Sequence, residues 1–481
     1  MDYISTRGQS PAVDSAQAVL SGLAPDGGLY VPAAIPAFDW RGCLGLSSQQ
    51  MSERILSALL PDIPNMGTLV QRAYTGKFET EDLTPTVPVG AFGVLELFRG
   101  PTSAFKDVAL SMLPQLLTAA KTEKGIQEEI RILTATSGDT GKAALVGFQD
   151  VPGVSICVFY PHGGVSQVQR AQMVTQEGSN VSVCAVEGNF DDAQTGVKQI
   201  FTQCQGKPLP FRLSSANSIN IGRLAPQIMY YFRSYQDLLD QGRIALGDPV
   251  DFSVPTGNFG DILAGFLAKR LGLPVGKLIC ASNANNVLTD FIRTGTYDRR
   301  RELLKTTSPS MDILVSSNLE RLLYLLSGDT ALVAGLMKEL NEKGVYQVPE
   351  ALLEKIQAEF FADFCDDQRA GEVIGRVYRD DGYLMDPHTA SGWAAAETYR
   401  EKTGSKNAMV VLSTASPYKF SSAVLTAIGG DTQGTEFERM ARLHQITGVP
   451  IPKPLAELQG KKMRHLDVIA KEDMLSYVLG R

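Results

Sequence analysis

Histidine and cysteine are scarce in this sequence, and neither is spaced for metal binding. The 481 residues include four histidines and six cysteines, and no H-x-x-x-H, H-E-x-x-H or C-x-x-C pattern occurs among them. Zinc chemistry, histidine-activated nucleophiles and a disulfide framework are therefore all disfavoured. Scattered cysteines without a C-x-x-C pattern are typical of proteins in a reducing compartment, so the sequence predicts a cytoplasmic protein without a metal site.

The sequence also lacks a basic excess and long apolar runs. Lys and Arg number 45 against 52 Asp and Glu, which gives a net charge of −7 and argues against nucleic-acid binding. No apolar run reaches the roughly 20 residues that a membrane helix needs. The opening MDYISTRGQS has neither a basic nor an apolar segment of a secretory signal. We expect a soluble protein with neither a nucleic-acid nor a membrane partner.

Short apolar runs alternate with glycine-containing turns and amphipathic stretches from about residue 130 onward. This alternation predicts an α/β fold with a mainly parallel sheet. Such sheets bind ligands beyond the carboxyl ends of their strands, where the turns lie. The expected strands are 130–135, 154–160, 180–186, 251–254, 277–283 and 409–415.

Changes in composition suggest the domain organisation. Residues 1–80 have their own turn cluster and are expected to form an N-terminal domain. A smaller α/β domain is predicted over 81–205 and a larger one over 206–430. The larger one includes a helical insertion at about 290–380, rich in Leu, Lys, Arg and Glu, and 431–481 is expected to pack on the body as a tail.

Two glycine turns are candidate ligand loops. SGDTGKA at 137–143 resembles a P-loop, but Thr136 and Ala143 stand where that motif needs Gly and Ser or Thr. It is either a ligand loop or a helix start capped by Ser137 or Asp139. GNFGD at 257–261 lies between an apolar strand and an amphipathic helix, where backbone N–H groups can bind one phosphate. The alternative is a plain tight turn.

Lys106 is a candidate reactive amine. Apolar residues such as Phe105 and Val108 surround it, and such surroundings lower the pKa of an amine, which suits Schiff-base chemistry. The alternative is an exposed lysine at a helix start. Together, an amine of this kind, a one-phosphate loop and a polar loop for an anionic substrate are what a pyridoxal phosphate enzyme requires.

Motifs along nearly the whole chain resemble the threonine synthase family. They include YISTRGQS…GLAPDGGLYVP, ELFRGPTSAFKD, TATSGDTGKAAL, NSINIGRL, PTGNFGDILAGF, SPSMDILVSSNLERLL and STASPYKF, in the family's order. The resemblance implies a fold type II enzyme of the longer branch, which uses pyridoxal 5′-phosphate to convert O-phospho-L-homoserine and water to L-threonine and phosphate. A related phospho-lyase, which would release 2-oxobutyrate, ammonia and phosphate, is the alternative.

The resemblance also implies roles for individual residues. Lys106 would form the imine with the cofactor and shuttle protons, and Thr414 would hydrogen-bond the pyridine nitrogen. The cofactor phosphate would be held by Gly257, Asn258, Phe259, Gly260 and Asp261. The substrate carboxylate would lie near Ser137, Asp139 and Thr140, and its phosphate near Ser218, Asn220 and Arg223.

Some assignments stay open at this point. Lys142 and Arg170 compete with Arg223 as the cation for the substrate phosphate. Asp386, His388 and Thr389 are expected to be structural, and the alternative is that they contact the site through a neighbouring residue. Arg99, Ser416 and Tyr418 depart from residues common in the family, without removing a group that the chemistry needs. The chain is expected to be a monomer or a homodimer.

Overall fold

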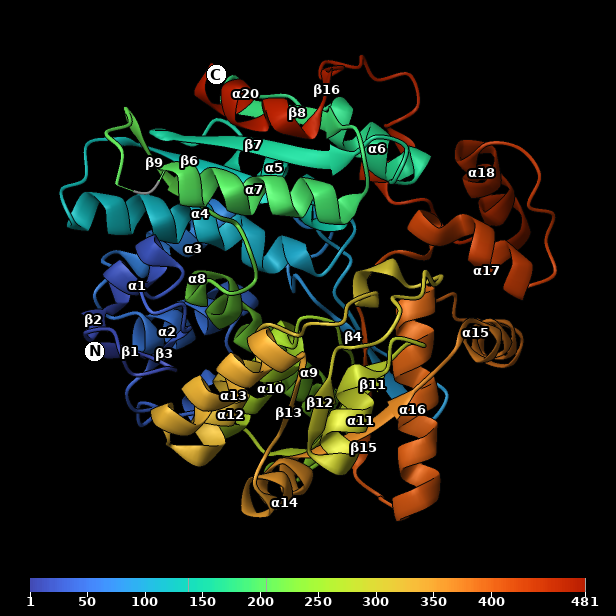
Figure 1. The fold of residues 1–481 in the computed structure, drawn as a ribbon. Helices are drawn as coiled ribbons and strands as arrows, with labels where there is room; N and C mark the ends of the chain where they lie inside the picture. The colour runs from blue at the N-terminus through green and yellow to red at the C-terminus, as the bar shows by residue number, and fades with distance from the viewer. Residues whose placement is uncertain (137, 205, 481) are drawn as a thin grey trace.

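The computed structural model describes residues 1–136, 138–204 and 206–480 of the chain. Two largely parallel sheets dominate it, and helices surround both of them (Figure 1). Smaller elements occupy the N-terminal region and an insertion between two strands of the larger sheet. No helix among the described residues is both long and apolar enough to cross a membrane.

The smaller sheet has five parallel strands in the order β16-β8-β7-β6-β9. Helix α7 covers β6 and β7, and α5 also packs on β7 and against α4. Helix α20, which lies beside the C-terminus (Figure 1), packs on α7. The strands are β6 (Glu129–Ala135), β7 (Val154–Pro161), β8 (Val181–Val186), β9 (Phe211–Ser214) and β16 (Val468–Ile469). The helices are α4 (Lys106–Glu123), α5 (Asp139–Phe148), α6 (Gln167–Val174), α7 (Phe190–Cys204) and α20 (Met474–Leu479).

The larger sheet has six strands in the order β14-β11-β10-β15-β5-β4, of which only the β4–β5 pair is antiparallel. Its strands are β4 (Thr86–Val89), β5 (Phe92–Glu96), β10 (Val250–Pro255), β11 (Val275–Ser282), β14 (Phe360–Phe364) and β15 (Ala408–Ser413). In β11, Leu278 packs in the core that includes helix α10 (Gly260–Arg270), while Ile279 packs in the core that includes α16 (Pro387–Thr403). Successive strand residues point to opposite faces, so both faces of this sheet are buried.

The remaining elements flank the two sheets. Near the N-terminus, β1 (Asp2–Ser5), β2 (Val13–Asp14) and β3 (Tyr30–Pro32) form a small sheet beside α1 (Ser15–Ser21), α2 (Ser48–Leu59) and α3 (Met66–Tyr74). The short strands β12 (Thr296–Asp298) and β13 (Val345–Gln347) pair in the insertion. The other helices used below are α8 (Ile221–Leu224), α12 (Leu319–Ser327), α13 (Thr330–Lys343), α14 (Glu350–Glu359) and α15 (Asp367–Asp381).

All six predicted strands are present, and the α/β prediction is confirmed. The sheets differ from the predicted division in two places. Strands β4 and β5, expected with the smaller domain of 81–205, lie in the larger sheet because β5 pairs with β15. Strand β9, expected in the larger domain, pairs with β6 in the smaller sheet. The insertion at 290–380 is mostly helical, but it also supplies β14, the edge strand beside β11.

Candidate active site

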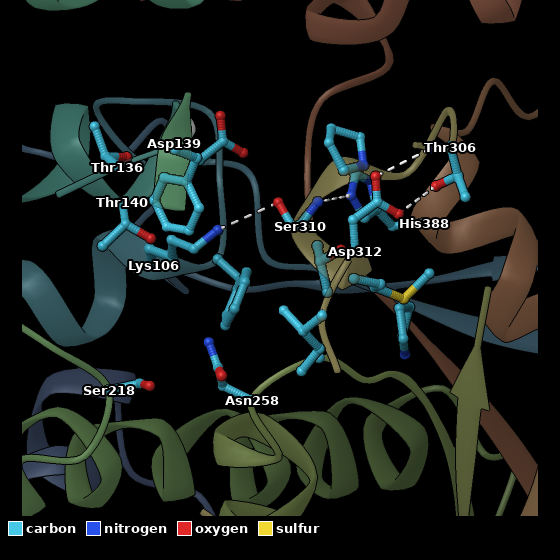
Figure 2. A pocket seen from close by; sticks show the side chains of 18 of the residues that line it. Lys106, Thr136, Asp139, Thr140, Ser218, Asn258, Thr306, Ser310, Asp312 and His388 are labelled. Carbon is cyan, nitrogen blue, oxygen red and sulfur yellow. Dashed lines mark hydrogen bonds between the residues drawn. The ribbon is translucent and has the colours of Figure 1, made fainter. Parts of the chain in front are cut away.

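A large cavity of about 2430 Å³ lies between the two sheets. Its lining includes residues within two positions of the ends of strands β6, β10 and β15, namely Thr136, Gly257 and Thr414. The carboxyl ends of strands from both sheets therefore open into one space, where α/β folds bind their ligands. Figure 2 shows Lys106, Asp139, Asn258 and Ser310 around this space.

The backbone between β5 and α4 places Lys106 beside Thr414. Ser103 has φ 57, a left-handed conformation unusual for a residue with a side chain. The N–H of Phe105 donates to the carbonyl of Thr414 at 2.8 Å, and the N–H of Ser416 donates to the carbonyl of Ser103 at 3.1 Å. Lys106 then begins helix α4, so a strained turn and two backbone hydrogen bonds fix the start of that helix against the end of β15.

Lys106 carries the properties expected of a reactive amine. Burial lowers the pKa of its amine to about 8, with contributions from the nearby charges of Lys419 and Arg223, while Asp139 and Asp261 act in the opposite sense. Its Nζ lies 3.5 Å from the Ser310 hydroxyl (Figure 2). A substantial fraction of this amine is therefore neutral near physiological pH, as nucleophilic and base chemistry require.

The GNFGD loop forms an uncapped helix start that borders the cavity. Phe259 has φ 63 and no side chain caps α10. Its ring is fully buried in the core, so this residue contributes only backbone to the site. A Cβ on Gly257 would lie 2.7 Å from the Ser310 carbonyl oxygen, so a residue with a side chain does not fit there. Backbone N–H groups at such a helix end are suited to a phosphate.

The remaining residues of this loop, Asn258, Gly260 and Asp261, also line the cavity. Asn258 points toward the space beside Lys106 (Figure 2), and its carbonyl accepts the Asn318 N–H at 3.1 Å. Burial raises the pKa of Asp261 to about 7, although its own helix N–H groups and Lys106 oppose the shift. A carboxyl that carries a proton part of the time near neutral pH can lie close to a phosphate with less repulsion than a full carboxylate would cause.

The SGDTG loop brings a buried ion pair to the cavity. Asp139 lies 2.7 Å from the Lys419 amine and also accepts a hydrogen bond from Gln169 at 3.0 Å. Burial alone would raise the pKa of Asp139, but Lys419 and Lys106 outweigh it and hold that pKa well below its usual value. Helix α5 begins at Asp139 with Gly138 as its N-cap, so Asp139 does not cap the helix. Thr140 lines the cavity, and Ser137 lies outside the described residues.

Arg223 brings a buried, incompletely paired guanidinium to the same cavity. It is 3% exposed, and its Nη1 donates to the Ala216 carbonyl at 2.5 Å. Its Nε has no hydrogen-bond partner among the described residues. Burial lowers the pKa of this guanidinium to about 10. A buried cation that keeps an unused donor is a suitable partner for an anionic ligand.

The two polar residues predicted beside Arg223 differ in their contacts. Ser218 lines the cavity, and its hydroxyl bonds Asn217 at 3.2 Å. Asn220 also borders the cavity, but its side chain accepts the Gly222 N–H and donates to the Val19 carbonyl, both at 2.8 Å. It caps helix α8 and so helps to place Arg223 on that helix.

The competing cations lie elsewhere. The amine of Lys142 donates to Gln176 at 2.6 Å, and Arg170 contacts the sulfur of Met463 at 3.9 Å. Neither is among the described residues that line the cavity. Arg99 forms ion pairs with two glutamates outside the cavity lining, Glu96 and Glu79.

Ser310 and Lys419 were not predicted as site residues, and His388 was predicted to contact the site only as an alternative; all three line the cavity. His388 accepts a hydrogen bond from the Ser310 N–H at 3.2 Å, which is the contact through a neighbouring residue that was the alternative to a structural role. Lys419 could have been singled out from STASPYKF, because it follows Thr414 closely in the same motif. Ser310 had no comparable signal, since nothing local indicates which residue meets Lys106 from 204 positions away.

These residues fit pyridoxal phosphate as a set. A lysine amine of lowered pKa, an uncapped glycine-lined helix start and the hydroxyl of Thr414 border one cavity. They match the aldehyde, the phosphate and the pyridine nitrogen of that cofactor in turn. The fold and the site define a pyridoxal-phosphate-dependent enzyme of fold type II.

Comparison with known proteins agrees with this class. Residues 75–343 match the family model described as pyridoxal-phosphate dependent enzyme. Residues 2–74 match the threonine synthase N terminus and 389–474 the threonine synthase C-terminal model. The chain belongs to the threonine synthase family, because these models match both of its ends and a threonine synthase is 40% identical to it over 97% of its length.

The chain matches individual relatives over different fractions of their length. Threonine synthase of Pseudomonas aeruginosa is 40% identical over 97% of this chain and 98% of its own. The structure of PLP-bound threonine synthase from Brucella melitensis matches with a TM-score of 0.88 and 39% identity, covering 100% of this chain and 99% of that one. Human threonine synthase-like 1 is 40% identical over 86% of this chain, which spans only 58% of that relative's length.

Proposed function

We propose that this chain is a threonine synthase, which converts O-phospho-L-homoserine and water to L-threonine and phosphate. The observation that carries this proposal is the presence of two anion-binding features in one cavity with Lys106. The uncapped start of α10 suits the cofactor phosphate, and the buried Arg223 suits a second phosphate on the substrate. A substrate without a phosphate would leave the Arg223 donor unused.

Pyridoxal phosphate, when bound, supplies an acceptor for the electron pairs released as C–H bonds of the amino acid break. In this proposal the reaction is a γ-elimination followed by β-addition of water. Lys106 Nζ takes a proton from Cα of the substrate and then one from Cβ, so that phosphate leaves from Cγ with the electrons of the C–O bond. Protonation at Cγ and addition of water at Cβ, with return of the Cα proton, then give threonine. Arg223 holds the phosphate that leaves from Cγ, and Thr414 orients the cofactor ring. In the same proposal the substrate carboxylate binds beside Thr140 and the Asp139–Lys419 pair, which line the cavity, and Lys419 supplies positive charge there. Ser218, Asn220 and Ser137 keep their predicted substrate contacts as part of the proposal.

The proposal extends to the location, assembly and domain organisation of the protein. We infer a cytoplasmic enzyme, with no nucleic-acid partner, that works as a monomer or homodimer. For the domains, we propose 1–80, 81–205, 206–430 and a tail at 431–481. Exchanging β4 and β5 for β9 between the two central units would place the whole six-stranded sheet in one unit. It would place the five-stranded sheet, apart from β16 of the tail, in the other.

The proposed reaction is tested by incubating the purified protein with O-phospho-L-homoserine and measuring phosphate, threonine and 2-oxobutyrate together. We expect phosphate and threonine in equal amounts. Phosphate matched by 2-oxobutyrate would contradict the synthase and support the phospho-lyase, which shares the elimination step. No phosphate at all would contradict both activities while leaving the family assignment intact.

The lowered pKa of Lys106 predicts how capture of the cofactor depends on pH. Only the neutral amine attacks an aldehyde, so the rate at which cofactor-free protein takes up pyridoxal phosphate should rise with pH and level off above about 8. With an ordinary lysine, whose pKa is about 10.4, the uptake rate would keep rising roughly tenfold per pH unit up to that pH. Stopped-flow absorbance of the bound cofactor between pH 6 and 10 measures the profile. A rate that still climbs steeply above pH 9 would contradict the assigned environment.

A further inference from the structure

Ser310 links three parts of the site that come from distant segments. Its hydroxyl lies 3.5 Å from Lys106 Nζ, and its N–H donates to His388 Nε2 at 3.2 Å. Its carbonyl oxygen would lie 2.7 Å from a Cβ on Gly257, so its backbone also lies close against the phosphate loop. Figure 2 shows Ser310 between Lys106 and His388.

The hydrogen-bond partners of His388 indicate its tautomer and its role. The Ser310 N–H can only donate, so Nε2 of His388 accepts, and the ring proton lies on Nδ1. Nδ1 then donates to Asp386 at 2.7 Å. The ring is 2% exposed, and both of its nitrogens are engaged in this way. His388 therefore holds the Ser310 backbone in place and has no nitrogen left to act as a base.

The same network continues to the strand that carries Thr414. The Thr389 hydroxyl donates to Asp386 and lies 3.0 Å from the Ser413 hydroxyl. Ser413 ends β15, directly before Thr414. One buried set of hydrogen bonds thus connects Ser310 to the end of β15, and buried networks whose members are all paired are rigid.

A second group of contacts fixes the loop on its other side. The carboxylate of Asp312 accepts hydrogen bonds from Asn283 at 2.8 Å, from Asn285 at 3.0 Å and from the Thr306 N–H at 3.0 Å. Asn283 and Asn285 are buried just beyond β11, so this group ties the loop to the larger sheet. Ser310 lies between two anchored points, and its hydroxyl is held at a defined place in the cavity.

We propose that Ser310 is a positioning residue for Lys106. The Ser310 hydroxyl accepts a hydrogen bond from the Lys106 ammonium and holds that amine toward the phosphate loop. The inference rests on the proposed function only in taking Lys106 as the reactive amine. No other side chain in the described part of the chain makes a hydrogen bond to Nζ of Lys106. The charged groups that face this amine are Asp139, Lys419, Arg223 and Asp261.

The charges around Lys106 act at longer range, whereas Ser310 acts by contact. An acceptor bonded to the ammonium stabilises the charged form, so its loss lowers the pKa of the amine. We expect Ser310→Ala to lower the pKa of Lys106 by about half a unit below its value in the unaltered protein. Ser310→Thr, which keeps the hydroxyl, should restore it.

The test is the pH dependence of Lys106 labelling in the full-length protein freed of cofactor. A small arylating reagent modifies neutral amines, and peptide mass spectrometry reports the rate at Lys106 alone. Ser317→Ala is the matched control, because Ser317 lines the same cavity in the same segment. The inference predicts a lowered pKa in Ser310→Ala and unchanged values in Ser310→Thr and Ser317→Ala.

Two outcomes of the labelling experiment would contradict the inference. A Lys106 pKa that does not change in Ser310→Ala, or that falls to the same extent in Ser317→Ala, would overturn the positioning role. Circular dichroism of each variant confirms that the fold is intact before labelling. Because labelling needs no turnover, a protein that forms no threonine but shows the Ser310 effect would refute the proposed function and leave this inference standing.

Discussion

Lys106→Ala is expected to abolish turnover of O-phospho-L-homoserine together with the visible absorbance of protein-bound pyridoxal phosphate. The side chain supplies both the amine that bonds the cofactor and the base that moves the substrate proton, so both functions are lost at once. We expect activity to fall by at least about 10⁴-fold, the upper range for loss of a positioned base. Absorbance spectra and the combined phosphate and threonine assay measure the two effects.

Lys142→Ala provides the matched control. Burial lowers the pKa of Lys142 to about 8 as well, so the two lysines share this property. Lys142, however, is not among the described residues that line the cavity, and its amine bonds Gln176. We expect this variant to keep both the cofactor and activity. If Lys142→Ala lost the cofactor absorbance and Lys106→Ala kept it, the reactive amine would have been assigned to the wrong residue.

The main architecture could be predicted because its strands are continuous apolar runs. Strands such as β7 and β10 are buried on both faces, and this leaves a strong pattern in sequence. Strands β9 and β14 were missed for physical reasons. They are short edge strands of four and five residues, and β14 lies in a stretch dominated by helical patterns. Only pairing with a distant strand stabilises them, and local sequence does not record that pairing.

The candidate site divides in a similar way. The GNFGD loop and Lys106 were predicted from local sequence. The loop places glycines between an apolar strand and an amphipathic helix, and Lys106 is a lysine among apolar neighbours. Ser310 and His388 were not assigned to the site, because their importance depends on contacts between segments 78 residues apart or more. Asn220 was predicted as a phosphate contact, and its role as the cap of α8 became visible only once the helix was located.

Arg223→Leu is expected to raise the KM for O-phospho-L-homoserine roughly 100-fold while the cofactor stays bound. The loss corresponds to one or two hydrogen bonds between charged groups, each worth about 1.5–3 kcal/mol. Steady-state kinetics measures KM, and competition by inorganic phosphate should weaken in parallel. Arg212→Leu is the control, since Arg212 is an exposed arginine paired with Glu128.

The melting temperature of the Arg223→Leu variant distinguishes a ligand-binding role of Arg223 from a structural one. A buried guanidinium with an unpaired Nε has a desolvation cost that its single carbonyl contact does not fully offset. Replacement by Leu removes this cost, so we expect the melting temperature of the variant to match or exceed that of the unaltered protein. A structural arginine would instead lose stability while KM stayed the same. That pair of results would show that the substrate phosphate is bound elsewhere, and Lys419 would then be the next cation in the cavity to test.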